Sequence, residues 1–109
     1  MTTSLPPEIE LLVMMSAARL GPDGAHARTI VEDIGQRHGR RVETADVIGT
    51  IEVLEERGFV STRVVESADE SLGDPIRLVT VEPEGAAAVE AATWEIRARL
   101  DALVLGDEG

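Results

Sequence analysis

The pattern of apolar and polar positions predicts four helices and one pair of strands. The first helix is expected over Glu8 to Leu20, directly after Pro6 and Pro7. Apolar residues cover most sides of this helix, and a helix of that kind is buried on more than one face. We therefore expect its second face to contact another subunit. Met14 and Met15 are candidate dimer or ligand contacts, with filling of the core as the alternative.

Two further helices are expected before the strands. Apolar residues at helical spacing predict a helix over Ala25 to His38, with Asp23 as its N-cap and Gly39 at its end. The next helix is predicted over Thr44 to Arg57, capped by Thr44 and closed by Gly58 in a left-handed conformation. Its core-facing positions are expected to be Val47, Ile51 and Leu54, helped by Ile48.

Residues that favour β-structure predict two strands, Phe59 to Val65 and Ile76 to Val81, joined by a polar loop long enough to form a wing. A final helix is expected from Pro83 to about Leu103. Its apolar residues fall in one stripe, whereas Trp94 lies on the far side of the helix. A lone Trp among alanines is typically an interface or packing anchor. The stripe consists of Val89, Ala92, Ile96, Leu100 and Leu103.

The element order helix, helix, helix, strand, strand, helix is that of a winged helix-turn-helix. We predict one domain over residues 1–109, mainly α with a small β-hairpin. The winged-helix core is expected at residues 6–82. The C-terminal dimerisation helix is expected at residues 83–104.

The amino-acid composition limits the kinds of core and of functional site that the chain can form. Hydrophobic residues make up 43% of the chain but aromatic residues only 2%, so the core is aliphatic, and such a core favours dimerisation. The absence of cysteine excludes a disulfide scaffold, a zinc finger and a thiol nucleophile. His26 and His38 have no ordered ligand spacing with carboxylates, so no metal site is predicted. No segment resembles a nucleophile elbow or a phosphate loop, so we expect neither an enzyme nor a cofactor.

The formal net charge is −11, and every cationic residue other than histidine is an arginine. Such acidity repels polyanions and anionic membrane surfaces. No apolar run reaches the roughly 18 residues of a membrane span. The opening segment MTTSLPPEIE lacks the basic and apolar regions of a signal peptide. We therefore expect a cytoplasmic protein without a membrane partner.

Three segments carry more specific motifs. VLEERGFVSTRVVES, at residues 53–67, is a helix end followed by a strand, and RLVTVEPEGAAAVEAATWEIRARLDAL, at residues 77–103, is a strand followed by a Pro-Glu-Gly helix entry. Together with the apolar run at residues 9–15, they resemble the PadR-like winged-helix transcriptional regulators, especially the short members. Single motifs of this kind also occur in the MarR and ArsR groups, but the combination with one C-terminal helix favours PadR.

This resemblance implies a homodimeric DNA-binding regulator. The third helix would dock in the major groove of double-stranded DNA, the wing would touch the backbone, and the last helix would dimerise the protein. Some family members hold flat aromatic molecules at the dimer interface, which makes Trp94 a candidate ligand or dimer contact and a planar effector a possible partner. The predicted DNA contacts are Arg40 and Arg41 for phosphates, Thr44, Asp46 and Thr50 for base edges, and Arg63 and Arg77 for the wing.

The charge of the reading region leaves a second interpretation open. Residues 40–77 contain five arginines and nine carboxylates, a net charge of −4, whereas DNA readers take much of their affinity from neutralised phosphates. The family commonly has Thr and Tyr where this chain has Asp46 and Ile48. Asp46 is compatible with DNA because an acidic side chain accepts a hydrogen bond from cytosine N4. The alternative is an acidic winged-helix interaction module that has lost DNA binding.

Overall fold

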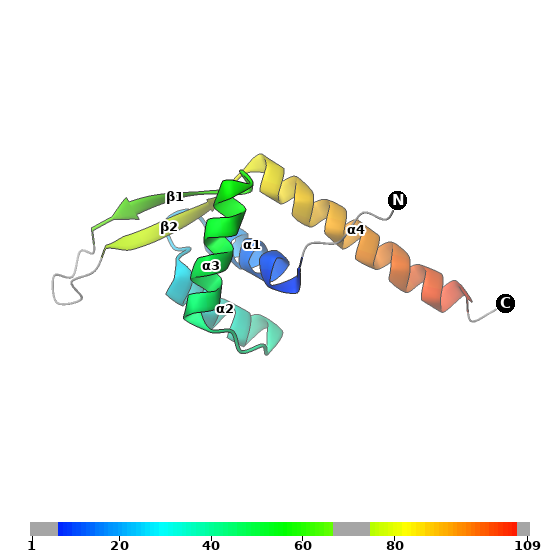
Figure 1. The fold of residues 1–109 in the computed structure, drawn as a ribbon. Coiled ribbons are helices and arrows are strands. Elements are labelled where there is room, and N and C mark those ends of the chain that lie inside the picture. Colours follow the sequence, from blue (N-terminus) through cyan, green and yellow to red (C-terminus); the bar gives the residue numbers. More distant parts are fainter. Residues whose placement is uncertain (1–6, 67–74, 107–109) are drawn as a thin grey trace.

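The computed structural model describes residues 7–66 and 75–106, and the described side chains of the last helix end at Val104. It confirms a mainly α fold with one antiparallel hairpin in the predicted order (Figure 1). The hairpin extends from one side of a three-helix body and the last helix from the other (Figure 1). Most of the predicted wing loop lies outside the described residues. The elements are α1 (Glu8–Leu20), α2 (Ala27–His38), α3 (Thr44–Glu56), β1 (Val60–Val65), β2 (Ile76–Val81) and α4 (Pro83–Gly106).

Helix α1 is central and contacts α2, α3, α4 and β2. Its bounds agree with the predicted ones, and its apolar residues are covered by the other elements of the same chain. Met14 is fully buried in the core, which removes it from the predicted dimer or ligand contacts. Met15 is half-buried. The nearly uniform apolar character of α1 is thus explained largely within one protomer.

A polar cluster joins α1 to α2. Ser16 is fully buried, and its hydroxyl donates a hydrogen bond of 2.5 Å to the Asp33 carboxylate. Arg19 also pairs with Asp33 at 2.5 Å, and Arg37 approaches it at 3.5 Å. Burial alone would raise the pKa of Asp33, but the hydrogen bonds from Arg19 and Ser16 and the two positive charges outweigh it and lower that pKa. The charged carboxylate therefore stabilises the α1–α2 contact.

Helix α2 begins at Ala27, two residues later than predicted, and Asp23 is not its cap. The N-cap is His26, whose backbone N–H donates to the Thr29 hydroxyl oxygen at 3.0 Å. That bond satisfies an amide at the helix start that Asp23 was expected to serve. The end of the helix is as predicted, because Gly39 adopts the left-handed conformation with φ of 62°.

Helix α3 carries the predicted core stripe. It starts at Thr44, but the N-cap is the preceding Glu43, so the prediction of Thr44 as the cap was wrong. The helix ends at Glu56, and Gly58 reverses the chain with φ of 78°, as predicted. Ile48 does not help the stripe, since it is 45% exposed. Adjacent helical residues point about 100° apart, so Ile48 cannot share the direction of its buried neighbour. The buried positions are Val47, Ile51 and Leu54.

The hairpin pairs β1 with β2 from Val60↔Val81 to Val65↔Ile76. Strand β1 begins at Val60, one residue later than predicted, and β2 has its predicted bounds. Residues directly opposite each other share one face of a sheet. The face that includes Val60 and Val79 joins the core, and the N–H of Val79 donates to the Ala25 carbonyl at 2.8 Å.

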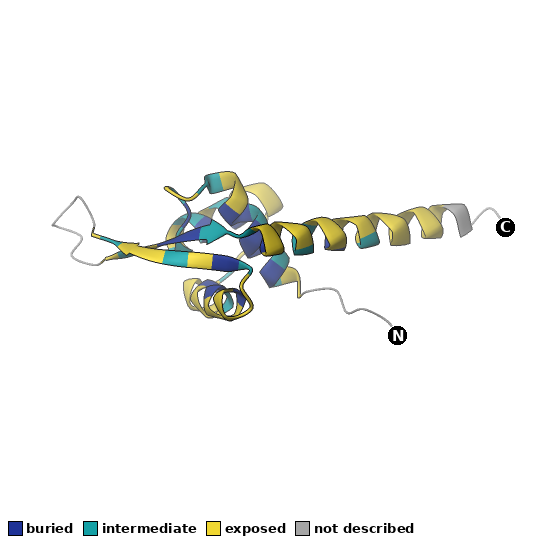
Figure 2. Ribbon diagram, turned by 90° about the horizontal axis from the view of Figure 1, so that it is seen from above, coloured by how far each residue is buried: buried dark blue, intermediate teal, exposed yellow. Residues whose placement is uncertain are grey.

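Helix α4 leaves the body after its first turns (Figures 1 and 2). Near its start Gly85 is buried, and Ala92 is 3% exposed. Beyond Ala92 the described residues do not cover the apolar stripe. The exposed large apolar side chains of α4 are Trp94, Ile96, Leu100, Leu103 and Val104. No described helix is long and apolar enough to cross a membrane.

Candidate nucleic-acid interface

The exposed side of α3 is the surface expected to meet DNA. Positions opposite the buried stripe are Ala45, Gly49, Glu52 and Glu56, and all four are exposed. Thr44 and Asp46, the other predicted base contacts at the start of α3, are exposed as well. Thr50 is half-buried, and its hydroxyl donates to the backbone carbonyl of Asp46 at 2.7 Å. The predicted base contact from Thr50 is therefore engaged by its own helix.

One flank of α3 faces the hairpin. The Thr62 hydroxyl of β1 donates to the Glu55 carboxylate at 2.6 Å, which fixes the direction of this flank. Ile48 and Glu52 lie seven and three residues before Glu55, so they share the flank. Ile48 is thus an exposed aliphatic residue on the flank of α3 that faces the hairpin, whereas its apolar character had predicted a core position.

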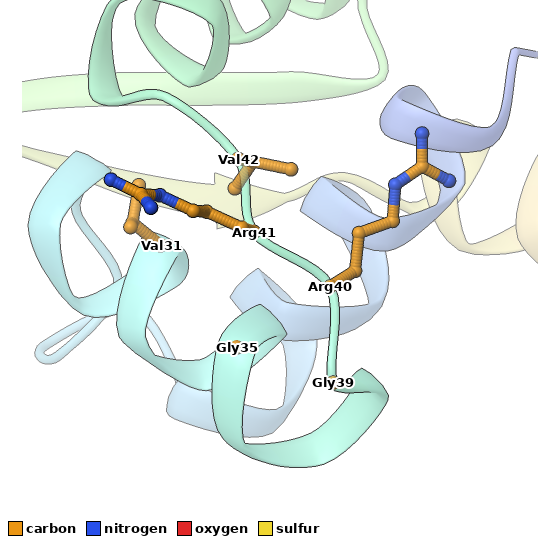
Figure 3. A pocket seen from close by; sticks show the side chains of 6 residues that line it. All are labelled: Val31, Gly35, Gly39, Arg40, Arg41 and Val42. Atoms are coloured by element: carbon orange, nitrogen blue, oxygen red, sulfur yellow. The ribbon is translucent and has the colours of Figure 1, made fainter.

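The two arginines before α3 point in different directions (Figure 3). Arg40 extends toward α1, where it forms an ion pair with Glu8. Hydrogen bonding and charge attraction in this pair lower the pKa of Glu8 and raise the pKa of Arg40. Arg41 instead points away from α1, toward the α2 side of the linker (Figure 3). The two guanidinium groups therefore do not form one cationic strip.

Arg41 borders a shallow, open depression between α2 and the linker that leads to α3. Its volume is about 320 Å³. Gly35 and Gly39 line the depression without side chains, so the backbone is accessible there (Figure 3). The depression is lined by Val31, Gly35, Gly39, Arg40, Arg41 and Val42.

The two wing arginines lie on opposite faces of the hairpin. Arg77 is opposite Val64, on the face that continues from Thr62 and therefore on the α3 side. Arg63 is opposite Leu78 on the other face. It pairs there with Asp23 at 2.8 Å, in the turn between α1 and α2. Of these two arginines, Arg77 alone lies on the hairpin face directed toward α3.

One further arginine near α3 was not among the predicted contacts. Arg57, directly after the helix, pairs with Glu10 of α1 at 2.8 Å, and Glu10 is 7% exposed. The pair links the end of α3 to α1 and supplies a partner for a buried carboxylate. Apart from its place near Gly58, no feature of the sequence signals this role.

No protein-family model matches the chain, and no curated protein matches it. Solved structures do. The PadR family transcriptional regulator from Eggerthella lenta DSM 2243 matches with a TM-score of 0.61 and 20% identity, over 89% of this chain and 78% of that one. A PadR family transcription regulator from Clostridium difficile R20291 matches with a TM-score of 0.71 and 12% identity, over 93% of this chain and 98% of that one. The chain has the PadR winged-helix fold.

A MarR family regulator from Rhodococcus sp. RHA1 is also similar to this PadR-fold chain. The TM-score is 0.62 at 19% identity, over 84% of this chain and 55% of that one. The arrangement of helices and hairpin is therefore shared by more than one group of regulators. At these identities the similarity establishes the fold.

The remaining predicted contacts of the PadR-fold chain lie away from α3. Trp94 is 66% exposed on α4, and Met15 is half-buried on α1. Within residues 7–66 and 75–106, no three side chains of the metal-binding types are grouped closely enough to hold an ion. The side chains with a geometry suited to a partner are thus those of α3, the wing and the outer part of α4.

Proposed function

We propose that this chain is a PadR-like transcriptional regulator that acts as a homodimer on a two-fold DNA site. The observation that carries the proposal is the PadR winged-helix fold with an exposed α3 beside the hairpin. A helix presented in this way fits the major groove, whose width admits one α-helix. Such a regulator acts where its DNA is, and we place the protein in the cytoplasm.

The outer part of α4 supports the dimer. Ile96, Leu100 and Leu103 recur at spacings of four and three and are 41%, 57% and 68% exposed. This stripe fits the packing of one helix against a second copy. Trp94 lies on the opposite side of α4, so it serves a separate contact, either within the dimer or with a planar effector. Met15, half-buried on α1, is a secondary candidate for the same interface.

The proposed DNA contacts differ in how available they are. Arg41 and Arg77 are exposed, and Thr44 and Asp46 are exposed on α3. Arg40 must exchange the Glu8 carboxylate for a phosphate. Arg63 must do the same with Asp23 and lies on the hairpin face away from α3, so its contact is the weakest of the set. We therefore expect a modest number of phosphate contacts and a correspondingly shallow salt dependence.

The test is binding to duplexes selected from a random library, measured by fluorescence anisotropy at several salt concentrations. We expect a linear decrease of log affinity with log salt. Arg77→Ala should reduce the slope by about one per protomer and weaken all sequences equally. Arg99→Ala, on the exposed part of α4, is the matched control and should leave the slope unchanged. If no duplex binds in a salt-dependent manner, DNA recognition is refuted.

One observation favours a second candidate function. Between Arg41 and Arg57 the chain has no cationic residue, while α3 presents the exposed carboxylates Glu52, Glu55 and Glu56. An acidic interaction module that binds a basic segment of a protein would use this same helix. It would bind a lysine-rich or arginine-rich peptide through these carboxylates and ignore duplex DNA, which distinguishes it from the regulator.

A further inference from the structure

The side chain of Ile48 is largely exposed in the part of the chain that the structure describes. Its neighbour Val47 is fully buried, but Ile48 is 45% exposed. Isolated apolar residues on a surface are ordinary, so exposure alone assigns nothing. What distinguishes Ile48 is its place, on the flank of α3 that Glu55 joins to the hairpin through Thr62. Under the proposed function α3 enters the major groove, so this flank of α3 would face the duplex on the hairpin side.

The surface beside Ile48 allows close approach. Ala45 and Gly49 are the neighbouring small residues on the outer side of α3. A Cβ added to Gly49 would meet nothing within 4 Å, so the glycine is not required by packing inside the protomer. Because neither residue projects far, Ile48 is the bulkiest apolar group on this side of the helix. Among the apolar side chains on this side of α3, it is the one that would extend furthest into a groove.

The polar neighbours of Ile48 cannot read most base edges. On its flank Glu52 only accepts hydrogen bonds, and Glu55 already accepts one from Thr62. The contact that gives an arginine reader its preference for guanine needs two donors, whereas the donor side chain on this flank of α3 is the single hydroxyl of Thr44, four residues before Ile48. Base recognition here therefore depends on that hydroxyl, on an apolar contact, or on acceptance from cytosine or adenine amino groups.

We propose that Ile48 is a specificity-determining residue that contacts the C5-methyl group of thymine in the major groove. Thymine is the base whose major-groove edge presents a methyl group, and aliphatic side chains are suited to it. The proposal rests on the proposed regulatory function and specifies how that function selects sequence. It predicts one critical thymine in each half of the two-fold site.

The experiment uses the full chain and a duplex obtained by selection. Each thymine is replaced in turn by deoxyuridine, which keeps the base pair and removes only the methyl group. We expect one replacement per half-site to weaken wild-type binding about fourfold, the factor for one buried methyl group. Ile48→Ala should lose sensitivity to that replacement while still binding with the wild-type salt slope.

Val53→Ala is the matched control. Val53 is 37% exposed on the other flank of α3, roughly 140° around the helix from Ile48. This variant should keep the full deoxyuridine effect, and unfolding curves should show that both variants are folded. The proposal is overturned if every deoxyuridine duplex binds like its parent, or if Ile48→Ala keeps the wild-type sensitivity. Absence of any salt-dependent duplex binding would instead refute the regulator, and this proposal with it.

Discussion

The first turns of α4 and its outer turns have similar apolar content but opposite surroundings. At the start, Gly85 is buried against the backbone of Phe59 and Ala92 is 3% exposed. Further along, Leu100 is 57% and Leu103 68% exposed. The sequence pattern continues across both parts, so helical periodicity alone does not tell which part is covered. Burial is decided by what lies opposite, and one protomer covers only the first part (Figure 2).

The difference separates folding from assembly. Changes at the packed start of α4 should act on the stability of the protomer, because the backbone of Phe59, directly before β1, already lies against it. Changes in the outer part should act on the proposed dimer, because no described element of the same chain covers the exposed stripe.

Gly85→Ala should destabilise the fold by about 3 kcal/mol, at the upper end of the usual cost of overpacking. The new Cβ would collide with the carbonyl oxygen and carbon of Phe59, which are backbone atoms and cannot move aside by rotation. Urea unfolding monitored by circular dichroism, at fixed protein concentration, measures the loss. Gly49→Ala is the control and should be neutral or stabilising, since its Cβ meets nothing within 4 Å. Equal effects of the two substitutions would contradict the packing described for Gly85.

Leu100→Asp should weaken the proposed dimer about a hundredfold, which corresponds to roughly 2.7 kcal/mol. A charge in the apolar stripe would lose its hydration on assembly, whereas the protomer leaves this position exposed. Sedimentation velocity over a concentration series measures the dissociation constant. Ala102→Asp introduces the same charge about 160° around the helix and should have a much smaller effect. A Leu100→Asp protein that dimerises like wild type would exclude this stripe from the interface.

The loss of an ion pair should also cost more free energy of unfolding in the packed body than on the exposed part of α4. Asp33→Asn, in the cluster between α1 and α2, should cost about 1.5 kcal/mol at neutral pH because two arginines and a buried hydroxyl surround the carboxylate. Glu95→Gln removes the partner of Arg99 on exposed α4 and should cost less than about 0.5 kcal/mol. Urea unfolding of both variants provides the comparison.

The contribution of Asp33 should depend on pH in a defined direction. Its pKa is lowered in the folded protein, so the carboxylate stabilises the fold fully above its unfolded pKa of about 3.9. That contribution is lost as pH falls through the lower, folded pKa. The stability difference between wild type and Asp33→Asn should therefore be constant from pH 7 to about 5 and should decrease below about 4. Thermal unfolding across this range measures it, and a difference that persists unchanged at pH 3 would contradict the assignment.

Local signals predicted the fold well where one residue type controls the backbone. Gly39 and Gly58 end their helices in left-handed conformations, as their positions suggested. The predicted start of α2 was wrong because the N–H of His26 donates to the hydroxyl of Thr29, the third residue of the helix. This capping interaction takes the place of the one expected from Asp23. Ile48 was misassigned because apolar character was read as burial, although its direction differs from that of Val47.

The candidate site was less predictable, because its electrostatics depend on contacts between distant parts of the chain. The pairs of Arg40 with Glu8 and of Arg63 with Asp23 each join separate elements, and no local pattern announces them. The placement of Arg77 on the α3 side depends on strand register, which the polar loop did not fix. Residue type indicated which side chains could bind phosphate, and the tertiary structure decides which are available.

The passage from β2 to α4 takes a single residue, Glu82. Its N–H donates to the carbonyl of Phe59, and its own carbonyl accepts from Ala86, so this joint is fixed on both sides. In a dimer assembled through α4, the angle between the two long helices would consequently determine how the two hairpins are oriented relative to each other. The distance between the two DNA-reading surfaces, and with it the spacing of operator half-sites, would then be adjustable from the far end of the molecule, by any ligand that tilts one α4 against the other.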